Sequence, residues 1–150
     1  MNTLRTLGAL ACALASINLS GCATTTVPKT SAEVVKDLGR EARAIARGRG
    51  YTGSRVFNGG SLNERQSGLL RFTLKGGKHY IAIGLCDEQC KDIDLGVFDQ
   101  DGFEIASDTM EDAIPIIELK PDKDTVAIFR TKMIRCDLKP CHYGVGIYRK

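Results

Sequence analysis

The sequence predicts a mainly β domain, an antiparallel β-sandwich of jelly-roll-like form preceded by one amphipathic α-helix. After Tyr51, short segments of alternating apolar and polar residues recur, with turns rich in glycine or aspartate between them. No helical pattern separates these segments, as it would in a parallel α/β fold. The chain has 150 residues, and the 129 that follow residue 21 are enough for one domain with an ordinary core.

The β pattern covers residues 51–150. Residues 70–75 alternate apolar and polar side chains, and Gly76-Gly77 then predicts a two-residue hairpin turn to the next strand. Residues 80–85 lack a polar face, which predicts a strand buried on both sides. Gln100-Asp101-Gly102 predicts a later turn. The segments expected to be strands are 70–75, 80–85, 93–99, 103–107, 114–119, 125–134 and 143–148.

The helix is expected within residues 31–50. Ser31 is a candidate N-cap, Glu33 lies in the first turn, and Gly48 and Gly50 mark the end. At about 100° per residue, the apolar residues share one face, which predicts packing against the domain. The opposite face carries a basic stripe of Lys36, Arg40, Arg43 and Arg47. Such a stripe is either solvated or, close to a bilayer, in contact with anionic head groups.

Two motifs carry a family resemblance. They are Leu-Lys-Gly-Gly-Lys-His-Tyr-Ile-Ala-Ile-Gly at 74–84 and Asp-Ile-Asp-Leu-Gly-Val-Phe-Asp-Gln-Asp-Gly-Phe-Glu-Ile-Ala-Ser-Asp at 92–108, followed by a late aliphatic strand. Over residues 68–148 the chain resembles the pre-peptidase C-terminal domain, a secreted accessory β-sandwich of bacterial proteases. The chain departs from that family in its paired cysteines and in having no protease sequence attached. Ligands that some members bind, matrix polymers or calcium, therefore need a matching site before they carry over.

The N-terminus resembles a bacterial lipoprotein signal peptide. Arg5 precedes an apolar run at residues 7–19, and the run ends in Leu19-Ser20-Gly21-Cys22. The resemblance implies a signal peptide over residues 1–21, cleavage before Cys22 and lipidation of the Cys22 thiol. The alternatives are a secretory signal cut near Ala23, with an incidental cysteine, and an uncleaved membrane anchor.

Residues 22–30 read as a tether, because three threonines in a row and Pro28 disfavour a helix. Its length would hold the domain close to the membrane. Ala23 follows the lipidated cysteine, and lipoprotein sorting in Gram-negative bacteria then favours the outer membrane, with the domain facing the periplasm.

Four cysteines remain in the domain, in the patterns Cys86-x3-Cys90 and Cys136-x4-Cys141. An even number in an exported chain predicts two disulfides. Three pairings are open, of which the two local ones are favoured because each closes a loop between strands. The alternative is a zinc site that includes His79 or His142.

Charge is distributed unevenly. Residues 87–112 contain ten acidic side chains and one basic one, and residues 120–150 contain eight basic and three acidic ones. Intramolecular pairing between neighbouring strands explains this most simply. Nucleic-acid binding would need a basic patch with interleaved aromatic residues, which the sequence lacks.

Strict antiparallel alternation from Tyr80 places the connections at 86–91, 107–113 and 135–141 at one end of the sandwich. Loops held by disulfides on a rigid sandwich are a common way to present a binding surface. The equally plain alternative is that the disulfides only stabilise a modest core. The candidate binding residues at this end are Asp87, Glu88, Asp108, Glu111 and Asp112.

Carboxylates at alternate positions raise a calcium hypothesis for Asp92, Asp94, Asp99 and Asp101. Asp99-x-Asp101-Gly102 matches part of an EF-hand loop. In that alignment Val97 stands at the first ligand position and Asp108, rather than Glu, at the last, so the full pattern is absent. The alternative is an acidic turn beside polar strand positions.

Catalytic motifs are absent from the sequence, and His79 and His142 are its only candidate neutral-pH bases. We therefore expect a lipid-anchored, exported, non-enzymatic module for binding or envelope assembly, with an envelope protein or polymer as its partner. The alternative is a periplasmic inhibitor or accessory factor of an envelope hydrolase. A cryptic hydrolase is the third hypothesis, and a deep cleft around either histidine would favour it.

Overall fold

The computed structural model describes residues 28–150, except residue 54. The signal peptide, Cys22 and most of the predicted tether lie outside these residues. One helix, α1 (Ser31–Gly48), precedes eight strands. The strands are β1 (Arg55–Leu62), β2 (Ser67–Leu74), β3 (Tyr80–Cys86), β4 (Cys90–Phe98), β5 (Glu104–Asp108), β6 (Ile116–Leu119), β7 (Thr125–Cys136) and β8 (Cys141–Arg149).

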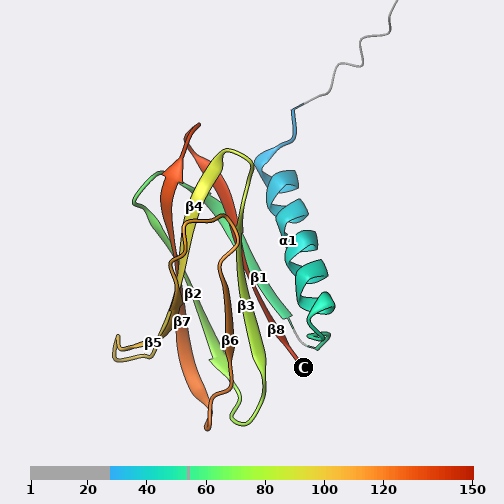
Figure 1. Cartoon of the computed structure of the whole chain (residues 1–150), viewed down its shortest axis with the longest axis vertical. Helices are drawn as coiled ribbons and strands as arrows, with labels where there is room; N and C mark the ends of the chain where they lie inside the picture. The colour runs from blue at the N-terminus through green and yellow to red at the C-terminus, as the bar shows by residue number, and fades with distance from the viewer. Residues whose placement is uncertain (1–27, 54) are drawn as a thin grey trace, which may run out of the picture.

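The strands form two four-stranded antiparallel sheets, which confirms the predicted sandwich (Figure 1). The first sheet has the order β1-β8-β3-β6 and the second the order β2-β7-β4-β5. The main core lies between the sheets and includes Leu74, Leu95, Phe129, Val145 and Ile147. Consecutive strands thus often change sheet, so the two sheets are held together by many crossing connections.

Helix α1 covers the outer face of the first sheet, parallel to the long axis of the sandwich (Figure 1). Leu38, Ala42 and Ala46 are buried against that face. These helix residues pack against Ile81, Ile83 and Leu85 of β3, which form a second apolar layer on the sheet. Residues Tyr80–Leu85 are buried on both sides, as predicted, because core lies on one face and α1 on the other.

Two local expectations are wrong. The N-cap of α1 is Thr30 and not Ser31, because the Thr30 hydroxyl accepts from the Glu33 backbone N–H while the Glu33 carboxylate accepts from the Thr30 N–H. Gly76-Gly77 is not a hairpin turn, since β2 and β3 belong to different sheets. Gly76 is needed there for another reason: a Cβ would lie 2.7 Å from the Lys123 Cα.

Other local expectations hold. The turn at residues 100–102 connects β4 to β5, and Gly102 adopts a φ of 89° that suits glycine. The pairing of β4 with β7 sets Asp94 directly opposite Lys132, in line with the expected pairing of the acidic and basic regions within the chain. Among the residues described, no helix has the length and apolar character needed to cross a membrane.

Candidate binding site

Both predicted local disulfides form. Cys86–Cys90 joins the end of β3 to the start of β4, and Cys136–Cys141 joins β7 to β8. The antiparallel pairings place these connections, 87–89 and 137–140, at one end of the sandwich, together with 63–66 and 109–115. We call this the disulfide end. Two disulfides in one small domain are typical of an exported protein.

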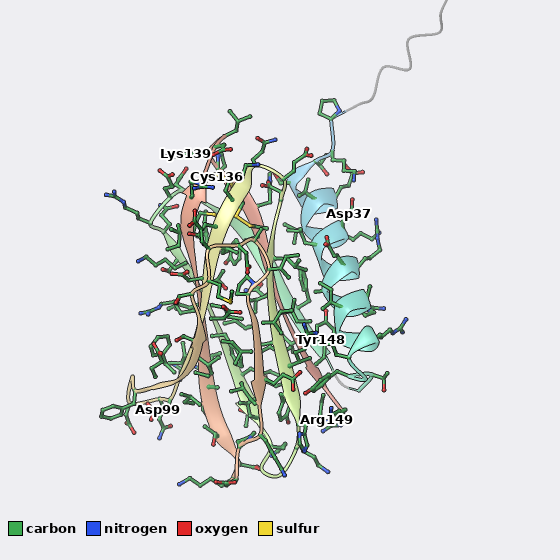
Figure 2. The ribbon with its side chains drawn as sticks, in the orientation of Figure 1. Asp37, Asp99, Cys136, Lys139, Tyr148 and Arg149 are labelled. Carbon is green, nitrogen blue, oxygen red and sulfur yellow. A yellow bond between two sulfur atoms is a disulfide. The ribbon has the colours of Figure 1, made fainter. Side chains whose placement is uncertain are left out.

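The start of α1 lies at the same end. In Figure 1 the blue N-terminal turn of α1 stands beside the connection from β3 to β4, and Figure 2 shows Lys139 and Cys136 at that end as well. The described chain therefore enters the domain at the disulfide end.

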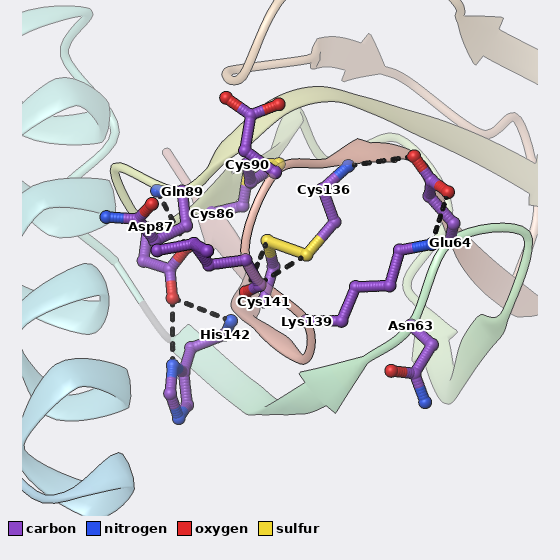
Figure 3. Close-up of a disulfide and its surroundings, with 12 residues drawn as sticks. Asn63, Glu64, Cys86, Asp87, Gln89, Cys90, Cys136, Lys139, Cys141 and His142 are labelled. Carbon is purple, nitrogen blue, oxygen red and sulfur yellow. Dashed lines mark hydrogen bonds and ion pairs between the residues drawn. A yellow bond between two sulfur atoms is a disulfide. The ribbon is translucent and has the colours of Figure 1, made fainter.

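An acid–histidine pair joins the two disulfide-closed connections. The Asp87 carboxylate accepts from the backbone N–H of His142 and lies 2.8 Å from its Nδ1 (Figure 3). In return, the Asp87 backbone N–H donates to the His142 carbonyl oxygen. The exposed fractions of the two side chains are 13% and 19%. This pair fixes the His142 ring on the side of the sheet that faces α1.

A third connection is held in the same region by Glu64. Its carboxylate accepts from the Cys136 N–H and lies 2.6 Å from the Lys139 ammonium (Figure 3). These contacts lower the pKa of Glu64, with the Lys139 hydrogen bond as the main cause. The connections 63–66 and 137–140 are thereby tied together before any partner binds.

An open groove of about 720 Å³ runs between α1 and the disulfide end. Four carboxylates line it, against one ammonium, that of Lys29. Asp37 and Glu41 come from α1, and Asp87 and Glu88 come from the connection between β3 and β4. Pro28, Val34 and Leu38 complete the lining with apolar groups, Gln89 with an amide and His142 with an imidazole. The groove is therefore acidic and is wide enough for a side chain or short segment of a partner.

The four carboxylates differ in how they are held. Asp37 pairs with Lys29 at 2.6 Å and with Arg40, and the Lys29 hydrogen bond is the main cause that lowers its pKa. Asp87 is held by His142. Glu41 and Glu88, both exposed, form no ion pair with the residues that the structure describes. These two carboxylates are the ones open to a cationic partner.

Three of the five predicted binding residues hold loops in place. Asp108 accepts from the N–H groups of Met110 and Ile116, and Asp112 accepts from the Ile114 N–H. Asp87 is engaged as described above. Glu111 is exposed and pairs with Arg135 at 3.1 Å, away from the groove. Of the five, only Asp87 and Glu88 line the groove.

The sequence alone did not identify Asp37, Glu41 and Lys29 as site residues. Their charges belong to a helix whose basic stripe was the more regular signal. Within the stripe, Lys36, Arg40 and Arg47 are exposed, whereas Arg43 is half-buried. The one available signal for the pair was that Asp87 and His142 each follow a disulfide cysteine, which brings them together once both loops close.

The calcium hypothesis involves residues in two places. Asp92 and Asp94 lie on the outer face of β4, where burial raises the pKa of both. Asp99 and Asp101 lie beyond the other end of β4, and Asp99 accepts from the N–H groups of Asp101 and Phe103. Within residues 28–150, leaving aside residue 54, no three His, Cys, Asp or Glu side chains are grouped to hold a metal ion.

The two histidines differ in their surroundings. His79 is exposed in the connection between β2 and β3, whereas His142 lines the groove. The groove is open along its length rather than a deep cleft. No Ser, Thr or Cys is among the residues that line it, so the Asp87–His142 pair has no hydroxyl or thiol nucleophile beside it there.

No protein-family model matches the sequence, and no curated protein matches it. A solved structure with a similar chain path is that of Aeromonas hydrophila PliG, a periplasmic lysozyme inhibitor of g-type lysozyme. The TM-score is 0.47 at 6% sequence identity, over 68% of this chain and 90% of that one. A similarity this low transfers no function.

Proposed function

We propose that this chain is an exported, lipid-anchored, non-enzymatic binding protein of the cell envelope. Its groove at the disulfide end would receive a basic segment of a partner protein. The observation that carries the proposal is the groove itself, an open depression whose walls present four carboxylates against one ammonium. Glu41 and Glu88 would make the ion pairs with the partner, and the half-buried Val34 would pack against its apolar atoms.

We further propose that the partner is an envelope hydrolase and that binding inhibits it. The support is that the groove wall formed by residues 87–89 and His142 is fixed before binding, by the Cys86–Cys90 disulfide and the Asp87–His142 pair. A surface held in its bound form loses little conformational entropy on association. Inhibitors of hydrolases generally bind in this preformed way, with little backbone movement.

Lipid anchoring rests on the motif Leu19-Ser20-Gly21-Cys22. From Cys22, the six residues to position 27 would reach roughly 20 Å when extended. Because α1 begins at the disulfide end, the groove would then lie close to the bilayer. The partner is accordingly proposed to be a protein that works at the membrane surface.

The test combines capture with an activity assay. The chain is cross-linked in intact envelopes and used to capture its partner. The purified chain is also added to an envelope extract, and the lytic activity of the extract is measured. The double variant Glu41→Gln with Glu88→Gln should weaken capture of the partner by about tenfold, since two exposed ion pairs are lost. It should relieve inhibition to the same extent.

The control removes the same charge at the other end of the molecule, through Asp101→Asn with Glu104→Gln. These residues are exposed and far from the groove. The control should capture and inhibit as the unchanged chain does. If the two double variants behave alike, or if lytic activity never changes, the groove is not the inhibitory site.

A further inference from the structure

The end of the sandwich opposite the disulfides contains a second hollow, which the proposed function does not use. It has a volume of about 420 Å³ and lies between β5 and the segment that follows β6. Its walls are mostly aliphatic, formed by Leu74, Ile105, Leu119 and Pro121. Lys120, Asp122, Lys123 and Thr125 complete its lining. The volume lies in the range of roughly 300–1,000 Å³ that small-molecule sites occupy.

The hollow borders the main core. Leu74 is a buried core residue, and Leu119 packs against the same core. Both β5 and β6 are edge strands, and they belong to different sheets, so no ladder of hydrogen bonds closes the gap between them. Ile105 lies at this gap with 46% of its surface exposed. An apolar ligand here would cover aliphatic surface that the fold leaves open to water.

The mouth of the hollow is basic. The neighbouring carboxylate of Asp124 is already occupied, because it lies 2.7 Å from the Lys75 ammonium and accepts from the Gly76 N–H. Lys120 and Lys123, by contrast, form no ion pair with any residue that the structure describes. Asp122 is the single carboxylate in the lining. Two unpaired ammonium groups therefore stand against one carboxylate beside an aliphatic hollow.

We infer that this hollow binds a single-chain aliphatic carboxylate. The chain would lie between Leu74, Ile105 and Leu119, where it extends the core. The carboxylate would lie at the mouth, within reach of Lys120 and Lys123. Charge complementarity at the mouth is what favours an anionic head over a neutral or cationic one.

The experiment compares three amphiphiles with the same ten-carbon tail: decanoate, decyltrimethylammonium and decyl maltoside. Each is titrated, below micelle formation, into isotopically labelled full-length chain carrying Cys22→Ser, which removes the acceptor for the lipid. Decanoate should bind saturably and shift the backbone amide signals of residues 119–125 and 104–106. The neutral and cationic amphiphiles should bind more weakly, by up to about fivefold, as expected for the loss of one exposed ion pair.

Two variants separate tail from head. Lys120→Gln with Lys123→Gln should reduce the affinity for decanoate to that for decyl maltoside. Ile105→Ser, at a half-exposed position that should tolerate a polar residue, should weaken all three amphiphiles together. The matched control, Lys36→Gln with Lys78→Gln, removes two exposed lysines outside the hollow and should leave the affinities for all three amphiphiles unchanged.

Equal affinities for the three amphiphiles would overturn the assignment of an anionic head. Absence of binding, or signal shifts elsewhere in the chain, would overturn the site itself. The hollow would then be free for another role, such as contact with a protein segment. The groove at the disulfide end is tested with different variants, so failure at one end leaves the other standing.

Discussion

The two ends of the sandwich hold their connections in place by different means. At the disulfide end, covalent bonds and carboxylate contacts join loops that come from both sheets. At the opposite end, the connections 75–79, 99–103 and 120–124 are held by turns, one ion pair and close backbone packing. The first arrangement leaves an acidic groove, and the second leaves an aliphatic hollow with a basic mouth. One small domain thus presents opposite chemistry at its two ends.

The largest expected effect concerns which end faces the membrane. Cys22→Ser should abolish membrane association, because the substitution removes the thiol that would carry the lipid. The mutant chain should accumulate in soluble form or as an unprocessed precursor. Intact mass of the membrane-extracted chain is the measurement, and an unmodified N-terminus in the unchanged protein would remove the reason to place the disulfide end near the bilayer.

The comparison of ends was partly predictable from the sequence. Cysteines spaced four and five residues apart favour local disulfides, and antiparallel alternation then places both at one end. The groove was not predictable, because Glu41 and Glu88 are brought together only by the packing of α1 on the first sheet. The hollow was not predictable either, because it depends on β5 and β6 being edge strands of different sheets with no hydrogen-bonded pairing between them.

The errors have a physical cause as well. Gly76-Gly77 has the composition of a hairpin turn, but composition does not say whether the next strand joins the same sheet. Ser31 and Thr30 are both good N-caps, and the choice was decided by Glu33, which stands three residues after Thr30 and completes a capping box. That spacing was present in the sequence.

A second prediction compares how much each end contributes to stability. Replacing Cys136 and Cys141 by Ala should lower the free energy of unfolding by about 2 kcal/mol, the loop-closure value for so short a ring. At the opposite end, Gly102→Ala should cost about 1 kcal/mol, because its φ of 89° disfavours a side chain. Denaturant unfolding of the two variants measures both.

Hydrogen exchange adds a local readout for the same pair. The cysteine variant should speed exchange in residues 63–66 and 137–140, and Gly102→Ala should leave those amides unchanged. Equal costs with no local difference would mean that the disulfides do not distinguish the two ends.

A third prediction concerns how two carboxylates, Asp92 on β4 and Asp124 at the end opposite the disulfides, make stability depend on pH. Burial raises the pKa of Asp92 in the folded state above its unfolded value. The folded state therefore holds the proton more tightly, and stability falls as pH rises through the folded-state pKa. Hydrogen bonding to Lys75 lowers the pKa of Asp124, which therefore adds stability above its unfolded pKa and loses it as pH falls through the folded pKa.

The two substitutions should accordingly have opposite signs at neutral pH. Asp92→Asn should stabilise the fold by up to about 0.5 kcal/mol at pH 7, since one carboxylate oxygen is buried without a hydrogen-bond partner. Asp124→Asn should destabilise it. The Asp92 effect should shrink as pH falls through its raised folded-state pKa, and the Asp124 effect should shrink only as pH falls further, through its lowered one. Melting curves from neutral to acidic pH would show whether they do.

The last prediction tests whether the two ends differ in their distance from the membrane. Helix α1, which carries the basic stripe, runs along the sandwich from the disulfide end towards the other (Figure 1). If the stripe lies on the bilayer, both ends are equally close to it. If only the tether holds the domain, the disulfide end is closer. Chain carrying Cys22→Ser should then bind phosphatidylglycerol vesicles better than phosphatidylcholine vesicles only in the first case.

In that case, Lys36→Gln with Arg40→Gln and Arg47→Gln should remove the preference, because each basic residue near the surface contributes about 1 kcal/mol. Arg43 is left unchanged, since it is half-buried and its Nε lacks a hydrogen-bond partner, so its replacement would disturb packing. The control removes Arg71, Arg130 and Lys132 from the outer face of the second sheet in the same way. Equal losses in both variants would mean that net charge alone attracts the chain, and the stripe would then be a solvated face.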